Sequence, residues 1–166
     1  MANKGSIALD ASIMPDTMRI HLRGESFFYL PADATEKWNY QLTNVTNSNQ
    51  VLISGNFVGN AVDSGGSGSG ARATGDKVKF LFIKNLGITD ASPPVSTGDS
   101  IYVSINNVAA AHNGTHCVEI PAGMSWYARC PNTTVAHIQA ISGQVNGSGA
   151  SSVKVQCIVA AILDDL

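Results

Sequence analysis

Residues Asp63–Phe82, DSGGSGSGARATGDKVKFLF, pass from almost pure Gly and Ser into a dense apolar run. This stretch can be a linker between two domains, a phosphate-binding loop, or a long loop inside one domain. A linker here would leave residues 1–62 to fold alone, and they hold too few strong strand patterns for that.

The residues after the second glycine argue against a phosphate-binding loop. Such a loop needs Gly, four residues and then Gly-Lys-Ser/Thr. Gly70 and Gly75 have that spacing, but Asp76-Lys77-Val78 follows. An aspartate repels phosphate, and a strand pattern stands where a helix N-terminus is required. We therefore interpret residues 63–76 as a Gly/Ser loop within one domain, free to order against a neighbour, since loops this long tend to be functional or disordered.

Composition limits the classes of protein. The 166 residues fit one domain on the prior of roughly 100–200 residues per domain. Charged residues make up 13%, about half the usual share of ~25%. The ten Lys and Arg are spread along the chain, whereas proteins that bind nucleic acid cluster them. We expect no nucleic-acid binding. Nor do we expect a membrane segment, because no run approaches the ~18 apolar residues of a membrane helix.

We expect no secretory signal in the first residues, and the three cysteines are too few and odd in number for a disulfide framework. Both features fit folding in a reducing cytoplasm.

Period-2 alternation dominates the chain and predicts an all-β fold. The clearest strand patterns are Met18–Arg23, Lys77–Lys84 and Ser100–Asn106. Weaker ones bring the total to eight or nine, separated by Gly, Pro and Asn: Tyr40–Leu42, Gln50–Ser54, His116–Ile120, Ser125–Cys130, Thr134–Ile141 and Ser152–Ile162. Residues Ile120–Met124, IPAGM, predict a tight turn with a positive φ at the glycine. Ala32–Trp38 is the one candidate for a helical turn.

Short connections favour antiparallel pairing. We therefore predict one antiparallel, jelly-roll-like β-sandwich over residues 31–166, with residues 1–30 as an N-terminal arm or first strands.

No constrained active site is visible. His112-Asn113-Gly114-Thr115-His116-Cys117 could be imagined as a zinc site together with Glu119 and Cys130. However, the paired Cys spacing of such sites is missing, so we favour a polar hairpin tip with Cys117 as a small core residue. No G-x-S-x-G occurs, and His21 and His137 are expected at polar positions of strands. We predict no catalytic residues, no metal and no cofactor.

Aromatic and basic residues form the candidate interface. Phe27, Phe28, Tyr29, Trp38 and Tyr40 fall within fourteen residues. The simple alternative is that they are buried; the functional one is a partner contact, where aromatics are enriched.

The basic residues Arg72, Lys77, Lys79 and Lys84 could complement an acidic partner, or they could only protect an exposed edge strand. The residues that we predict at an interface are Phe27, Phe28, Tyr29, Trp38, Arg72, Lys77 and Lys79.

The C-terminal half carries a family resemblance. It reads KVKFLFIKNLGITD, then GDSIYVSINN, then HCVEIPAGMSWYARCPNTTVAHIQAIS and finally SVKVQCIVAAIL. This order, with its IKN-(T/L)-G strand, I-x-AG-x-x-W hairpin and strand ending in AIS, resembles small virion proteins of tailed bacteriophages, namely capsid decoration (cement) proteins. The resemblance spans roughly residues 76–162 and implies a small β-sandwich, often a jelly roll.

The same resemblance implies a homotrimer on the capsid exterior, bound to the major capsid protein and without catalytic residues. The alternative from the residues themselves is a carbohydrate- or receptor-binding sandwich of a virion fibre or tail, with Trp38, Trp126 or Tyr127 as a stacking platform. A metal-dependent hydrolase built on His112–Cys117 is a third hypothesis.

Overall fold

The computed structural model describes residues 4–13, 20–29, 36–53, 60–61, 75–130, 133–147 and 149–164. The chain divides into two compact units, residues 1–33 and 34–166. The boundary expected between residues 30 and 31 lies outside the described residues, and so does nearly all of the Gly/Ser loop 63–76.

The first unit contains a β-hairpin. Strands β1 (Lys4–Ile13) and β2 (Ile20–Tyr29) pair antiparallel over ten residues, from Lys4 opposite Tyr29 to Ile13 opposite Ile20. They form a sheet of two strands, with no third strand among the described residues. Met18–Arg23 therefore overlaps a real strand, whereas the strand at Lys4–Ile13 went unrecognised as a separate element.

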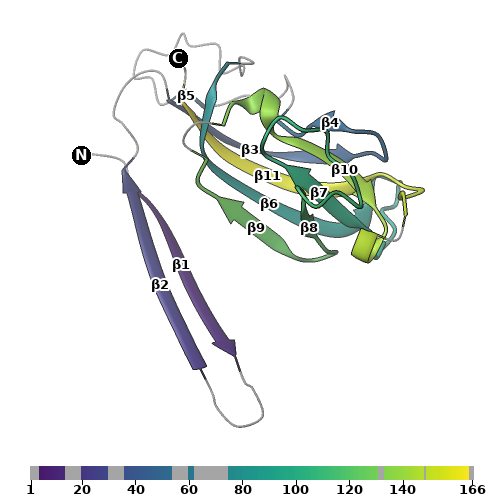
Figure 1. Cartoon of the computed structure of the whole chain (residues 1–166), viewed down its shortest axis with the longest axis horizontal. Coiled ribbons are helices and arrows are strands. Elements are labelled where there is room, and N and C mark those ends of the chain that lie inside the picture. The colour runs from purple at the N-terminus through teal and green to yellow at the C-terminus, as the bar shows by residue number, and fades with distance from the viewer. Residues whose placement is uncertain are drawn as a thin grey trace. The chain divides into compact units, whose positions relative to one another are not determined.

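The second unit is a sandwich of two antiparallel sheets (Figure 1). The larger sheet has the order β5-β3-β11-β6-β9. Its strands are β3 (Glu36–Val45), β5 (Asn60–Ala61), β6 (Lys77–Thr89), β9 (Ser125–Ala128) and β11 (Val155–Asp164). The long strand β11 lies between β3 and β6, so the chain's last strand is at the centre of the sheet.

The smaller sheet has the order β4-β10-β7-β8. Its strands are β4 (Gln50–Val51), β7 (Ser100–Ser104), β8 (Val118–Ile120) and β10 (Gln139–Gly143). Two short 3-10 turns, η1 (Val135–His137) and η2 (Val145–Gly147), flank β10. All five residues of β7 are buried, so both faces of this strand are covered.

One hydrophobic core lies between the two sheets. The larger sheet contributes Val45, Leu81, Ile83, Val159 and Leu163, among others, and the smaller sheet contributes Ile101, Val103, Ile120 and Ala140. These residues alternate with outward-facing ones along each strand, which is the arrangement that a sandwich requires. The predicted all-β antiparallel sandwich is thus confirmed, while the jelly-roll connectivity stays a prediction.

Several local expectations need correction. Glu36–Trp38 belong to a strand, not to a helical turn, because the backbone of β3 pairs with β11 over its whole length. His137 lies in the 3-10 turn η1, not on a strand. Lys84 lies where β6 is paired on both sides, with β11 and β9, and Lys77 is bridged to Thr134, so neither of these two lysines protects an exposed edge.

Candidate interaction surfaces

The two motifs behind the family resemblance meet at one buried side chain. Asn85, in the IKNLG segment of β6, is fully buried. Its side-chain amide donates hydrogen bonds to the carbonyls of Asp99 (2.9 Å) and Ile120 (3.0 Å), and its side-chain oxygen accepts one from Gly87 N–H (2.9 Å). A buried side-chain amide whose donors and acceptor are all hydrogen-bonded stabilises the fold.

The same asparagine also holds the IPAGM turn. Its N–H donates to the Met124 carbonyl and its carbonyl accepts from Gly123 N–H, both at 3.0 Å. The turn closes through Met124 N–H to the Pro121 carbonyl, with φ +78° at Gly123, so the expected positive φ is confirmed. The motifs therefore describe how β6 is joined to the turn between β8 and β9, two strands that belong to different sheets.

A second polar cluster surrounds Glu119 of β8. Its Oε1 accepts hydrogen bonds from Ser100 Oγ (2.7 Å) and Asn146 N–H (2.7 Å), and it lies 3.0 Å from the Tyr102 hydroxyl. Burial raises the pKa of this carboxyl, but the hydrogen bonds outweigh that effect and hold the pKa below its usual value.

The Tyr102 ring is only 4% exposed and fixes the loop after β10. Its hydroxyl lies 2.6 Å from the Gln144 carbonyl and accepts a hydrogen bond from Gly147 N–H (2.7 Å). Burial is the main reason why the pKa of Tyr102 is raised. Tyr102 and Glu119 together anchor η2, where Asn146 and Gly147 both have positive φ.

The His112–Cys117 segment is a loop beside this cluster. His116 Nε2 is 3.0 Å from the Ala109 carbonyl, and Cys117 Sγ accepts a hydrogen bond from Ala111 N–H at 3.4 Å. The hollow that it borders has a volume of about 500 Å³ and is also lined by Tyr102 and Glu119. Within the described residues, no three His, Cys, Asp or Glu side chains gather in a way that could hold a metal ion. Cys117 is half-buried and precedes β8, whereas Cys130 and Cys157 are the buried cysteines.

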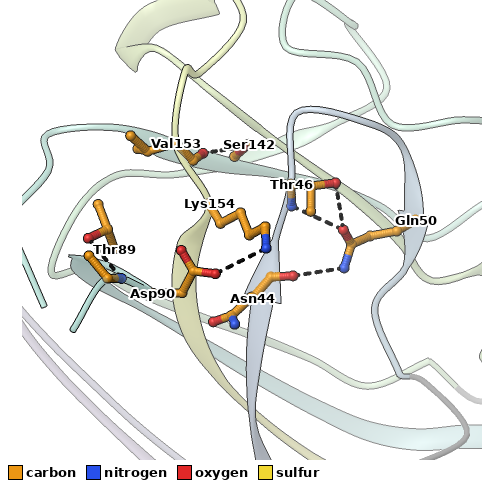
Figure 2. A network of polar contacts seen from close by, with 9 residues as sticks. Asn44, Thr46, Gln50, Thr89, Asp90, Ser142, Val153 and Lys154 are labelled. Atoms are coloured by element: carbon orange, nitrogen blue, oxygen red, sulfur yellow. Dashed lines mark hydrogen bonds and ion pairs between the residues drawn. The ribbon is translucent and has the colours of Figure 1, made fainter.

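A larger hollow of about 720 Å³ lies where β6 ends and β11 begins. Figure 2 shows the ion pair at this place, between Lys154 Nζ and Asp90 Oδ2 at 3.2 Å, close to the hydrogen bonds that join Gln50 to Thr46 and to the Asn44 carbonyl. Lys154 is largely exposed, and the remaining contacts are between neighbouring turns. These contacts join the turn between β3 and β4 internally, and the segment after β6 to the segment before β11.

The register of the hairpin separates apolar from polar residues. Directly paired residues of an antiparallel ladder share a face, and successive residues alternate between faces. By register, one face of the ladder carries most of the apolar residues together with Gly5, Gly24 and Ser26. We name it the apolar hairpin face: Ile7, Leu9, Ala11, Ile13, Ile20, Leu22 and Phe28. The opposite face holds the charged residues: Lys4, Asp10, Arg23 and Glu25, with His21, Phe27 and Tyr29.

The outward face of the larger sheet also carries an apolar surface. Pairing puts Leu42, Ile158 and Lys84 in one row across β3, β11 and β6, and Ala160, Phe82 and Tyr127 in the next row, across β11, β6 and β9. Leu42 is 59% exposed and Tyr127 is 42% exposed. We name this surface the apolar sheet patch: Leu42, Phe80, Phe82, Tyr127, Ile158 and Ala160.

The residues expected at an interface are distributed over both units of the chain. Phe28 lies on the apolar hairpin face, and Phe27 and Tyr29 lie on the opposite face of the same strand. Trp38 pairs with Ile162 of β11. Lys77 and Lys79 are half-buried on β6, and Arg72 lies outside the described residues.

Sequence reasoning missed most of the apolar sheet patch. The signal is present in the sequence, because Lys77–Lys84 becomes apolar on both faces. That pattern predicts a central strand, but it does not predict which residues of other strands share its second face.

The chain matches no protein-family model, no curated protein and no solved structure. Among the described residues, no helix has the length and apolar character needed to cross a membrane.

Proposed function

We propose that this protein is a virion structural protein that binds the outside of a phage capsid and stabilises the expanded shell. In this proposal it acts as a homotrimer and bridges neighbouring copies of the major capsid protein. Copies that bind only the expanded lattice stabilise it by mass action, without any chemistry.

The amphipathic hairpin is the observation that carries this proposal. A two-stranded hairpin is marginally stable at best in water, and apolar residues on one face are stabilised when another protein surface covers them. The sandwich, by contrast, has a complete core of its own. A self-sufficient body with a binding arm suits a protein that joins other subunits. In this proposal the arm and the aromatic stretch from Phe27 to Tyr40 contact capsid subunits.

The apolar sheet patch favours protein contact over sugar binding. A stacking platform for sugars is an exposed aromatic ring with hydrogen-bonding groups beside it. Tyr127 is exposed, but its neighbour across the strands is Phe82, and Trp126 packs against the core. This arrangement is typical of a protein interface, where aromatic residues are enriched. The carbohydrate-binding alternative therefore receives no support from Trp126 or Tyr127.

The proposal is tested on expanded phage shells that lack bound accessory proteins. Full-length protein is expected to co-sediment with these shells, to saturate, and to raise their melting temperature, while unexpanded shells bind none. A chain lacking residues 1–30 is expected to lose most of this binding. Full binding by the shortened chain would contradict the claim that the arm contacts the capsid. If the full-length chain binds no tailed-phage shell, the claim that it is a capsid-binding protein is wrong.

A further inference from the structure

We propose that Asn113 is a site of spontaneous deamidation, and that the fold protects the second Asn-Gly pair of the chain from the same reaction. The sequence contains Asn-Gly twice, at Asn113-Gly114 and at Asn146-Gly147. All four of these residues line the hollow that also contains Glu119. The inference concerns the chemistry of the chain itself, so it goes beyond the proposed function and does not depend on it.

The reaction needs water and no other reagent. The backbone nitrogen of the glycine forms a bond to Cγ of the preceding asparagine, and the side-chain NH2 leaves as ammonia with the proton of the glycine N–H. Water then opens the resulting succinimide ring at one of its two carbonyls, which gives aspartate or isoaspartate. Glycine favours ring closure because it has no Cβ to restrict the backbone rotation that brings the two groups together.

At Asn113 the restraint on this rotation is local. The Asn113 side chain is exposed, and the Gly114 N–H donates a hydrogen bond to the Ala111 carbonyl at 3.0 Å, which closes the turn Ala111–Gly114. An exposed turn of this kind opens at low free energy, because few contacts are broken. Ring closure at Asn113 therefore requires the opening of a single turn.

At Asn146 the restraint comes from the sheet. The Asn146 N–H donates a hydrogen bond to Glu119 Oε1, and the Gly147 N–H donates one to the Tyr102 hydroxyl, both at 2.7 Å. Tyr102 belongs to β7 and Glu119 to β8, so these bonds hold η2 on the smaller sheet. A hydrogen bond to an ionised carboxylate is stronger than one between neutral groups. The Gly147 nitrogen is released only when η2 separates from the sheet.

Close packing at Gly147 adds to this restraint. A Cβ at Gly147 would lie 2.6 Å from the His112 carbonyl oxygen, and one at Gly143, the last residue of β10, would lie 2.6 Å from the His112 Cβ. The backbone of the loop after β10 thus lies against the segment at His112 with no space for a further atom. Since Asn146 starts at φ 60° and ψ 26°, rotation towards ring closure would disturb this packing.

Peptide mapping of the full-length protein measures both rates in one sample. Protein is incubated at pH 8 and digested, and aspartate and isoaspartate are quantified at the two sites by mass spectrometry. In the folded protein the rate at Asn113 is expected to exceed the rate at Asn146 by roughly tenfold or more. In denaturant the two rates should become nearly equal, because the local sequences Asn-Gly-Thr and Asn-Gly-Ser are almost the same.

A hydroxyl deletion tests the protecting bond. Tyr102→Phe keeps the ring but removes the acceptor of the Gly147 N–H, so it should raise the rate at Asn146 by roughly threefold to tenfold and leave the rate at Asn113 unchanged. Tyr127→Phe, which removes a hydroxyl from an exposed ring on the other sheet, is the matched control and should change neither rate.

The wild-type rates alone can overturn the inference, whether or not the Tyr102 variant folds. Equal rates at the two sites of the folded protein, or no product at Asn113, would show that Asn113 is not the preferred site. With a folded Tyr102→Phe chain, an unchanged rate at Asn146 would contradict the protecting role of the hydroxyl. An equal rise at both sites would also contradict it, because it would indicate general unfolding.

Discussion

The Asn85 side chain of β6 donates a hydrogen bond to the carbonyl of Ile120, the last residue of β8, at 3.0 Å. This bond joins the two sheets, since β6 belongs to the larger sheet and β8 to the smaller one. We expect Asn85→Ala to destabilise the fold by about 2–3 kcal/mol, because it leaves buried backbone groups without partners. Chemical denaturation measures this, with Asn47→Ala in an exposed turn as the control; an Asn85 variant as stable as that control would contradict the structural role.

Gly147, in the loop after β10, occupies a position that only glycine tolerates well. Its φ of +67° disfavours other residues, and a Cβ there would lie 2.6 Å from the His112 carbonyl oxygen. Gly147→Ala is therefore expected to cost about 1–3 kcal/mol of stability. Gly98→Ala is the matched control, since a Cβ at Gly98 meets nothing within 4 Å. Thermal melting of the two variants should differ clearly, and equal melting temperatures would count against the described loop.

Glu119 links stability to pH. Its pKa is lower in the folded protein than in the unfolded chain, so its ionised form contributes stability above the unfolded pKa, and that contribution is lost as the pH falls through the folded pKa. Glu119→Gln should lower the melting temperature at pH 7, and the difference from wild type should shrink in acid, where Glu119 is protonated. A difference that stays constant with pH would show that the charge is not what stabilises the η2 loop.

The cysteines should differ in reactivity. Burial raises the pKa of the Cys157 thiol to about 12 and also raises that of Cys130, and a thiol reacts through its thiolate. Under native conditions at pH 8, an alkylating reagent is expected to modify the half-buried Cys117 first. Mass spectrometry of digested protein identifies the modified site, and Cys117→Ser should abolish the fast phase. Fast modification of Cys157 would place it outside the core.

The sequence by itself determined the fold class, because residue alternation follows directly from the geometry of a strand. The alternation predicted strands at Ser100–Asn106 and Lys77–Lys84. The IPAGM turn was predicted from its glycine, because glycine adopts a positive φ without steric cost. The alternation of Ile7, Leu9 and Ile13 also indicates the strand at Lys4–Ile13. It was overlooked since small and polar residues dilute the pattern.

Only the tertiary structure decided which distant residues contact each other and which residues share a surface. Asn85 could not be recognised as a joint between sheets, because its partners lie far along the chain, at Asp99 and Ile120. The apolar sheet patch likewise depends on the order β3-β11-β6-β9, which puts Leu42, Ile158 and Tyr127 on one surface. Local propensity specifies each strand, but strand order is set by the packing of the whole core, so a surface assembled from four strands exists only after folding.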